Sequence, residues 1–361
     1  MGTGKDNSVE ATLREYRSRI NHQMGQFFSS ATATLDLDLS PQSVKALGRL
    51  ADFSLRPGMR LRGSLGAWAY DQANKSSFAQ MGLELGVALE LIQNYFLIVD
   101  DVMDRSDFRR GKPSLHKLFA KEHQLKGDEH IADMLAINVG ALAHHLASLI
   151  VARLDEAPDR VDKALQLFGR SVAATVFGQI DDLYQNDRRQ VSEVDIIRAY
   201  YLKSSTYTFI NPLQMGAVLG GNPSSKTLAQ IDEFGAAAGI AFQLKDDMLG
   251  VYGEPAQTGK PNLDDIKEGK ITLLMHYGLK QASPQEVKVL KLHLGNPKFN
   301  QADLARVRRI LQDCGAKESV QKRIESYAKQ AKALTSKSDF WTPPAKQFLN
   351  ELIDFVTERQ K

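Results

Sequence analysis

The sequence lacks the features that define several large classes of protein. Only one of its 361 residues is a cysteine, Cys314, which excludes an internal disulfide framework and fits a reducing, cytoplasmic compartment. Its 46 basic and 43 acidic residues leave a formal net charge of +3, without the clustered excess of Lys and Arg that is typical of nucleic-acid binding. We therefore expect a cytoplasmic protein that binds no nucleic acid.

Long uninterrupted apolar segments are also missing. The longest, residues 131–154, contains Asp133, His144, His145 and Arg153, so we interpret it as a buried helix. The first twenty residues lack the apolar core of a secretory signal, and the opening MGTGKD lacks the Ser or Thr of a myristoylation signal. We expect no membrane span.

Alternating, strand-like segments are scarce, whereas apolar residues recur at helical spacing over long windows. Most prolines lie at expected helix starts or in loops, but Pro212 falls inside a helical pattern and predicts a kink just after residues 203–206. No Gly/Ser-rich linker interrupts the pattern, so we predict one all-α domain. The expected helices cover residues 9–29, 41–53, 60–73, 80–104, 131–154, 159–187, 192–219, 226–250, 269–281, 285–294, 301–313, 317–335 and 344–358.

Three carboxylates end one of these helices, in the segment LIVDDVMD. Asp100 and Asp104 are four residues apart, which places their Cβ atoms roughly 5–6 Å apart on one helix face, and Asp101 lies beside them. Such acids repel one another unless a cation neutralises them, and Mg²⁺ does so with one or two carboxylates plus substrate phosphates. Arg109 and Arg110 follow, and guanidinium groups bind phosphate oxygens. This composition indicates a metal–diphosphate site; the alternative is a solvated helix end with local salt bridges.

A second pair of acids, Asp246 and Asp247, ends another apolar helix in FQLKDDMLG. A pair of acids before a lysine-rich loop is more often a surface feature, but its coincidence with the first cluster favours a site. The cations that could join it are Lys203, Lys260 and Lys270, and Asp182 in GQIDD could support the metals.

The sequence shows no Ser/His/Asp or Cys/His arrangement for nucleophilic catalysis. The spacing of His116, His144 and His145 does not suggest a zinc site. We interpret these three histidines as structural.

In this order, DDVMD with RRGKPSLH, then FQLKDD with TGKP and EGK, resemble the motifs of the trans-isoprenyl diphosphate synthases, or polyprenyl synthetases. The likeness runs from about residue 56 to 272 and is greatest to farnesyl and geranylgeranyl diphosphate synthases. It implies a single large helical bundle around a deep central cavity, normally a homodimer. The domain would span residues 1–361, with the motif-bearing core at about 40–285 and the C-terminal helices, 285–361, in the same domain.

The resemblance also implies a role for each matching residue. The ligands of Mg²⁺, three ions with substrate bound, would be Asp100, Asp101, Asp104, Asp246 and Asp247. The residues around the allylic diphosphate would be Arg109, Lys203, Gln243, Lys260 and Asp182. The residues that bind isopentenyl diphosphate would be Arg62, Gln93 and Arg110. The catalytic residues would be Lys203, Asp100, Asp104 and Asp246.

The implied reaction is the head-to-tail condensation of dimethylallyl, geranyl or farnesyl diphosphate with isopentenyl diphosphate. Tyr95 and Phe96 lie about one helical turn before Asp100, so their rings could floor the cavity and stop chain growth. The other interpretation is that both rings pack the core. We predict farnesyl diphosphate (C15) as product, with geranylgeranyl diphosphate (C20) as the close alternative.

The sequence departs from the family pattern at two positions. Gly250 stands where the second motif often has a third acid, a loss that many members share. Met59 stands where a lysine usually precedes the paired arginines, and it cannot donate a charge to a diphosphate. Arg56, Arg60 and Arg62 are the nearby cations that could replace that lysine.

Three other functions stay open at this point. Met59 favours a terpene cyclase or other lyase on the same scaffold, which needs no isopentenyl diphosphate, whereas Arg62, Gln93 and Arg110 favour the synthase. A non-catalytic subunit of a heteromeric synthase would have no need of complete aspartate clusters. A phosphohydrolase would need a nucleophile or a positioned water that the sequence does not reveal.

Overall fold

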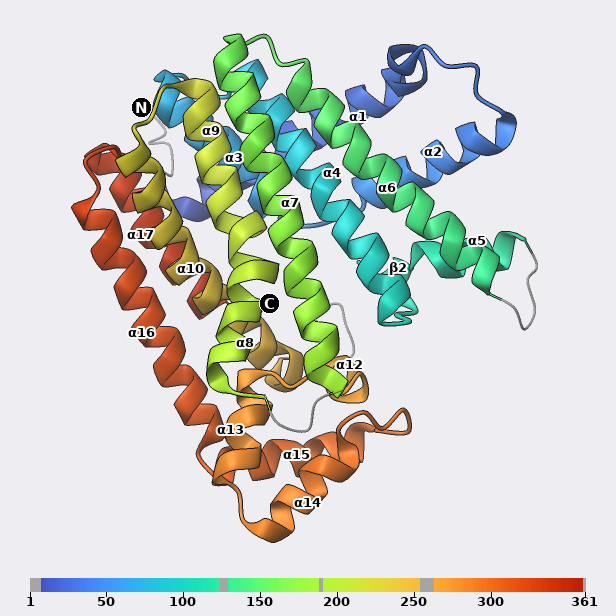
Figure 1. Ribbon diagram of the computed structural model, residues 1–361, viewed down its shortest axis with the longest axis vertical. Coiled ribbons are helices and arrows are strands. Elements are labelled where there is room, and N and C mark those ends of the chain that lie inside the picture. The colour runs from blue at the N-terminus through green and yellow to red at the C-terminus, as the bar shows by residue number, and fades with distance from the viewer. Residues whose placement is uncertain (1–7, 124–128, 188–190, 254–262, 360–361) are drawn as a thin grey trace, which may run out of the picture. The chain divides into compact units, whose positions relative to one another are not determined.

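Helices form almost all of the computed structural model, which describes residues 8–123, 129–187, 191–253 and 263–359 (Figure 1). The helices are α1 (Val9–Leu35), α2 (Pro41–Leu55), α3 (Leu61–Asn74), α4 (Gln80–Met103), α5 (Leu115–Glu122), α6 (His130–Ala152), α7 (Pro158–Asp187), α8 (Glu193–Tyr200), the π-helix η1 (Tyr201–Ile210), α9 (Asn211–Gly220), α10 (Ser225–Tyr252), α12 (Asp264–Lys267), α13 (Leu273–Gln281), α14 (Pro284–His293), α15 (Gln301–Asp313), α16 (Ala316–Lys337) and α17 (Pro343–Glu358). The strands are β1 (Phe108–Arg109) and β2 (Lys112–Pro113). The all-α prediction is confirmed.

Prolines begin several of these helices, as the sequence predicts. The first helical residue is a proline in four helices, at Pro41, Pro158, Pro284 and Pro343. An N–H group at this position has no acceptor within the helix, so proline costs no hydrogen bond there. The hairpin β1–β2 and the short helices α5 and α12 were not predicted, because each is too short for a periodic apolar pattern.

The π-helix η1 lies immediately before Pro212, where the sequence predicts a kink. Pro212 has no N–H to donate to the carbonyl four residues earlier, and the backbone of residues 201–210 instead takes the wider π form. Such segments are rare and occur often at functional sites. Lys203 lies inside this one.

The chain divides into two compact units, each described by itself below. The first comprises residues 1–168 and 211–223, and the second comprises residues 169–210 and 224–361. That the two form a single domain stays a prediction.

Helices α3, α4, α6 and α9 make up the centre of the first unit, where α3 packs on both α4 and α9 and α4 packs on α6 (Figure 1). The contact of α3 with α9 is unusually close. A Cβ atom on Gly216 would lie 2.3 Å from the carbonyl oxygen of Gly66, so only glycine fits there. Leu65, Leu85 and Leu89 are fully buried in this core.

In the second unit, α10 packs on η1 and α16. Its apolar core is formed by side chains of α10, α13 and α15, among them Leu244, Leu273 and Leu311, all fully buried. Burial of this apolar surface holds α10 in place, and α10 carries the second pair of aspartates.

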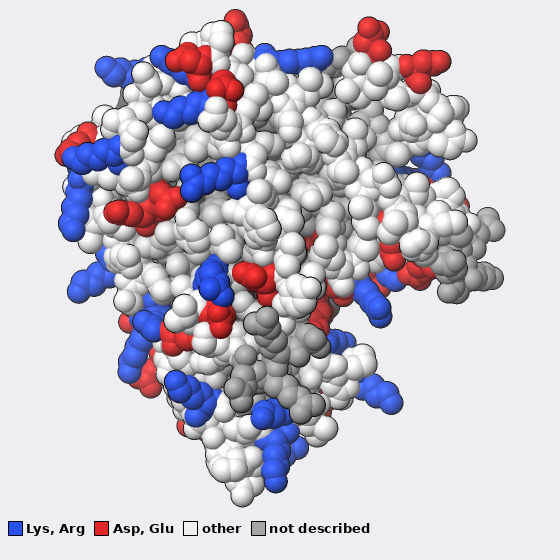
Figure 2. Space-filling model, in the orientation of Figure 1, with Lys and Arg blue, Asp and Glu red and all other residues white. Residues whose placement is uncertain are grey.

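Two described helices, α4 and α6, are long and apolar enough to cross a membrane by length and composition alone. The core helices of folded proteins also meet these two conditions. The most apolar 18-residue stretch is 72% buried in α4 and 39% buried in α6. Helix α6 therefore presents a larger apolar surface than α4. On the face shown in Figure 2, basic and acidic side chains are interspersed.

Candidate functional site

The paired arginines lie on a hairpin directly after α4. In the ladder of β1 and β2, Arg109 pairs with Lys112, which leaves Arg110 and Gly111 as a two-residue turn. Both turn residues have positive φ, 55° and 73°, as in a type I′ turn. Glycine adopts this conformation without strain, whereas an arginine there is uncommon and indicates a functional position.

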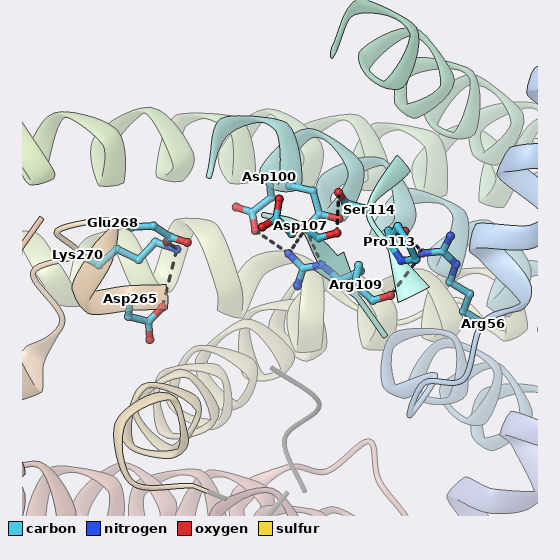
Figure 3. Close-up of polar contacts among 10 residues, drawn as sticks. Arg56, Asp100, Asp107, Arg109, Pro113, Ser114, Asp265, Glu268 and Lys270 are labelled. Atoms are coloured by element: carbon cyan, nitrogen blue, oxygen red, sulfur yellow. Dashed lines mark hydrogen bonds and ion pairs between the residues drawn. The ribbon is translucent and has the colours of Figure 1, made fainter. Parts of the chain in front are cut away.

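Arg109 turns back from the hairpin onto the aspartates at the end of α4 (Figure 3). Its Nε donates to Asp101 Oδ1 at 2.7 Å, its Nη2 also contacts Asp101, and Nη2 lies 3.6 Å from Asp100 Oδ2. Burial by itself would lower the pKa of Arg109, but the charges of Asp101, Asp100 and Asp104 outweigh burial and raise that pKa. Asp101 is buried against Arg109, whereas Asp100 and Asp104 are partly exposed.

Arg56 supports the hairpin from behind. Its Nη1 donates to the carbonyl oxygens of Arg109 at 3.3 Å and Pro113 at 2.9 Å (Figure 3). Its Nε and Nη2 bond Asp52, and its side chain is fully buried. Arg56 therefore holds the backbone of the arginine hairpin and does not replace the charge missing at Met59.

Arg60 is also bound to the protein itself. Its Nη2 donates to the carbonyl oxygens of Ser54 at 2.6 Å and Arg56 at 2.8 Å, and its Nε donates to Asn21 Oδ1 at 2.8 Å. Arg60 also pairs with Glu90 at 3.5 Å. The expectation that Arg56 or Arg60 could replace the family lysine at position 59 is thus corrected, because both guanidinium groups already bond protein oxygens.

The predicted residues for isopentenyl diphosphate contain buried polar atoms that bond nothing. Among the described residues, Arg110 Nη1 and Gln93 Oε1 are both buried without a hydrogen-bond partner. Burial and the positive charges of Arg60, Arg109 and Arg62 outweigh the negative charge of Glu90 and lower the pKa of Arg110 to about 10. Unbonded buried groups are rare and call for an explanation. A bound anion would accept a hydrogen bond from Arg110 Nη1, whereas Gln93 Oε1 is itself an acceptor and would need a donor.

The loop before α3 lies against this arginine. A Cβ atom on Gly58 would contact the Arg110 guanidinium at 3.4 Å, so the backbone there packs on the charged group. Met59 itself is 42% exposed. Arg62 is partly exposed at the start of α3 and is close enough to influence the pKa of Arg110. That Arg62 replaces the lysine stays a prediction.

In the second unit, Asp246 and Asp247 lie in contrasting environments. The Asp246 side chain is 56% exposed, whereas Asp247 is buried. Burial, with the charges of Asp265 and Asp246, raises the pKa of Asp247 well above its usual range.

Arg359, which sequence reasoning missed, covers Asp246. Its Nη2 donates to Asp246 Oδ1 at 2.8 Å, and its guanidinium lies 4.2 Å from the ring centre of Phe242, a cation–π contact. The Arg359 side chain is only 7% exposed. No sequence motif contains Arg359, because it lies over a hundred residues from Asp246, the acid with which it pairs.

Lys203 points from η1 to α7. Its Nζ donates to Asp182 Oδ2 at 2.7 Å, so the structure brings these two predicted residues together. The close approach depends on Gly178, where a Cβ atom would lie 2.5 Å from the backbone nitrogen of Lys203. Lys203 thus has a fixed direction within its unit.

The departure at Gly250 has a structural explanation. A Cβ atom on Gly250 would lie 2.5 Å from Asp265 Oδ2, so the carboxylate of Asp265 fills the space of a side chain at that position. Lys270 Nζ lies 2.6 Å from Glu268 Oε2 and 3.9 Å from Asp265 Oδ1 (Figure 3). Asp265 therefore supplies an acid next to the second pair. The predicted residue Lys260 lies outside the described residues.

Tyr95 and Phe96 pack together on α4, with ring centres 5.0 Å apart. Tyr95 also contacts His144 of α6 at 5.6 Å, and His144 stacks on Phe168 at 5.8 Å. Burial lowers the pKa of His144, which favours the neutral ring. The aromatic pair is thus backed by a second layer of rings.

The donors present suit a hard divalent cation. Asp100, Asp104 and Asp246 offer carboxylate oxygens that are at least partly exposed. In the described part of the chain, no group of three or more His, Cys, Asp or Glu side chains is arranged to hold a metal by itself. This arrangement fits Mg²⁺, which takes one or two protein carboxylates and completes its shell with substrate phosphates and water.

Comparison with known proteins shows the family to which the chain belongs. The polyprenyl synthetase family model matches residues 44–311. The chain is 31% identical over 282 residues to a geranylfarnesyl diphosphate synthase of Aeropyrum pernix, covering 77% of this chain and 83% of that protein. It is 28% identical over 351 residues to a short chain isoprenyl diphosphate synthase of Methanothermobacter thermautotrophicus, covering 96% and 98%. A crystal structure of geranylgeranyl pyrophosphate synthase from Corynebacterium glutamicum, complexed with isoprenyl diphosphate and magnesium, superposes with a TM-score of 0.88 at 29% identity, covering 96% and 99%.

The chain therefore belongs to the polyprenyl synthetase family, with the all-α fold of that family. It is a prenyltransferase that makes prenyl diphosphates. The resemblance inferred from the motifs is confirmed.

Proposed function

We propose that the chain is a short-chain trans-prenyl diphosphate synthase that condenses an allylic diphosphate with isopentenyl diphosphate in a Mg²⁺-dependent reaction. The observation that carries this proposal is the buried, unbonded Nη1 of Arg110 among other arginines. A cyclase or lyase needs a single diphosphate site. A second site for an anion, on residues that match the isopentenyl diphosphate positions, supports the synthase.

In this proposal the allylic diphosphate is held by the acidic clusters and by cations of the chain. Asp100, Asp104 and Asp246 would hold Mg²⁺, three ions with substrate bound, and the bound metal would stabilise charge on the departing oxygen. Arg109 and Lys203 add positive charge at the same diphosphate, with Gln243 and Asp182 in support. Apolar and aromatic side chains, Tyr95 and Phe96 among them, would shield the allylic cation from water.

The experiment incubates the purified protein with Mg²⁺ and dimethylallyl, geranyl or farnesyl diphosphate, each with and without isopentenyl diphosphate. Products are identified by mass spectrometry. A synthase elongates the allylic chain only when both substrates are present. A hydrocarbon or alcohol formed from the allylic substrate alone would support the cyclase, and no turnover would support a non-catalytic subunit.

We propose a C15 or C20 product. The adjacent rings of Tyr95 and Phe96 beneath the first aspartates support the shorter chain. The names of the relatives support the longer one, since several are geranylgeranyl diphosphate synthases and one is a geranylfarnesyl diphosphate synthase. Chain-length analysis of the same incubation distinguishes these products.

We further propose that the protein is a homodimer. Two helices present apolar side chains to the outside: α6 with Ile131 and Met134, and α7 with a stripe spaced three or four residues apart, Val176, Phe177, Ile180, Leu183 and Tyr184. Exposed apolar side chains of this kind can mark an interaction site, and two copies of one chain provide matching apolar faces.

A further inference from the structure

The two carboxylate oxygens of Asp247 are both occupied by side chains of the protein. Oδ1 accepts a hydrogen bond from Gln243 Nε2 at 2.8 Å, and Oδ2 accepts one from the hydroxyl of Tyr200. Asp247 is only 7% exposed. Asp246, next to it, is 56% exposed and pairs with the guanidinium of Arg359.

These hydrogen bonds extend in two directions. The Tyr200 hydroxyl oxygen accepts from the backbone N–H of Leu273 at 3.0 Å, and Gln243 Oε1 accepts from the hydroxyl of Ser204 at 2.6 Å. Asp247 thereby links α10 to the end of α8, to η1 and to the start of α13. All of these residues belong to the second unit.

The two residues anchored in this way, Tyr200 and Ser204, lie on either side of Lys203. A π-helix is an uncommon backbone form that needs support from its surroundings. Gly239 allows α10 to pack closely against η1, because a Cβ atom there would lie 2.4 Å from the Cα of Ser205. The direction of Lys203 therefore depends on hydrogen bonds that end on Asp247.

We propose that Tyr200 is a positioning residue that acts through Asp247, and that Asp247 anchors η1 and so sets the direction of Lys203. The proposal rests on the proposed function and deepens it, since it adds to the same site a residue that lies outside the family motifs. Its physical basis is that a carboxylate with both oxygens bonded to protein donors has to break two buried hydrogen bonds before it can bind a metal ion.

The first test counts bound metal without using turnover. Mn²⁺ replaces Mg²⁺, inorganic diphosphate is the probe, and the number of ions bound per chain is measured by electron paramagnetic resonance. We expect D246N to bind at least one ion fewer than the unmodified protein. We expect D247N to bind the same number, because its remaining carbonyl oxygen still accepts the Tyr200 hydroxyl.

The second test separates positioning from simple stabilisation. Y200F removes one hydroxyl, and Y201F, on the next residue of the same segment, removes a hydroxyl that bonds Asp232 at 3.4 Å. We expect Y200F to lower kcat by roughly 10–100-fold, with the Mg²⁺ concentration for half-maximal rate changed by less than about threefold. Y201F should change kcat and the Mg²⁺ concentration for half-maximal rate by less than about twofold relative to the unmodified protein.

Loss of a bound ion in D247N, matching the loss in D246N, would overturn the proposal. So would an unchanged kcat in Y200F, even with a lowered melting temperature, because the hydroxyl would then serve stability alone. If the unmodified protein elongates no substrate, the proposed function fails, but the count of Mn²⁺ ions still decides between the two acids.

Discussion

At the scale of single residues, the arginines of the loop before α3 and of the hairpin after α4 divide into structural and functional groups. Arg56 and Arg60 bond backbone oxygens, and Arg109 bonds Asp101. Arg110 has a buried nitrogen without a partner. Sequence alone could not make this division, because all four side chains carry the same charge. The acceptors that the fold places around each guanidinium group tell them apart.

Replacement of Arg110 tests this division. R110Q removes the charge that would bind the second diphosphate. We expect kcat/KM for isopentenyl diphosphate to fall roughly a hundredfold, which corresponds to about 3 kcal/mol of transition-state stabilisation. The KM of the allylic substrate should change little. Steady-state kinetics with each substrate varied in turn measures both values.

A matched control lies on the same hairpin. Lys112 pairs with Asp52 at 2.9 Å and its side chain is 54% exposed, so K112Q also removes one positive charge but from the surface. We expect kinetics within about twofold of the unmodified protein, since exposed ion pairs contribute little. Equal losses in R110Q and K112Q would mean that the hairpin acts through net charge alone.

The aromatic pair on α4 makes a prediction about product length. If Tyr95 and Phe96 floor the cavity, then Y95A and F96A remove rings from the path of the growing chain. We expect products longer by one or more five-carbon units, measured by mass spectrometry of the diphosphates. Unchanged product lengths in both variants would leave core packing as the role of these rings.

At the scale of elements, the helices were predictable and the connections between them were not. Long helices such as α10 and α16 have sustained apolar periodicity, so their bounds agree with the sequence to within a few residues. The hairpin β1–β2 depends on a two-residue turn with Arg110 at positive φ, a conformation that the usual Asn-Gly or Asp-Gly signal would have revealed. The π-helix η1 was predicted only as a kink.

The hairpin turn provides a test at this scale. Gly111 has a φ of +73° with nothing within 4 Å of its Cβ position, so G111A is strained by its backbone alone. We expect a loss of roughly 1 kcal/mol in the free energy of unfolding and a raised KM for isopentenyl diphosphate, because Arg110 is the other residue of the turn. Chemical denaturation and kinetics measure the two effects.

Gly48 in the middle of α2 is the matched control. Its Cβ position is also free of neighbours within 4 Å, but its backbone is helical. G48A should therefore gain about 0.5–1 kcal/mol in stability, with unchanged kinetics. A stabilised G111A with unchanged kinetics would show that the turn does not set the position of Arg110.

At the scale of the whole molecule, pairs of distant residues define the site, and these were the hardest to predict. Asp265 fills the space beside Gly250, and Arg359 covers Asp246; neither follows from local periodicity. The motif residues themselves were predictable because their order along the chain resembles that of the family motifs. What the sequence could not provide was their protein partners, which decide which charges remain for a ligand.

The proposed dimer is tested through the exposed apolar faces of α6 and α7. M134K and F177K each place a charge in such a face, and burying an unpaired charge is costly. We expect both variants to shift toward the monomer in light scattering coupled to gel filtration. L292K is the control, since Leu292 is 68% exposed on α14, and it should leave the mass unchanged. A monomeric unmodified protein would contradict the proposal.

The proposed synthase activity requires that both aspartate clusters bind one diphosphate through metal. The direct measurement is calorimetric binding of a non-ionisable thio analogue of an allylic diphosphate, with Mg²⁺ and with EDTA, to the unmodified protein and to D100N and D246N. We predict binding that requires Mg²⁺ and is weakened at least tenfold by either substitution. Binding that persists in EDTA, or that one of the two substitutions leaves unchanged, would contradict it.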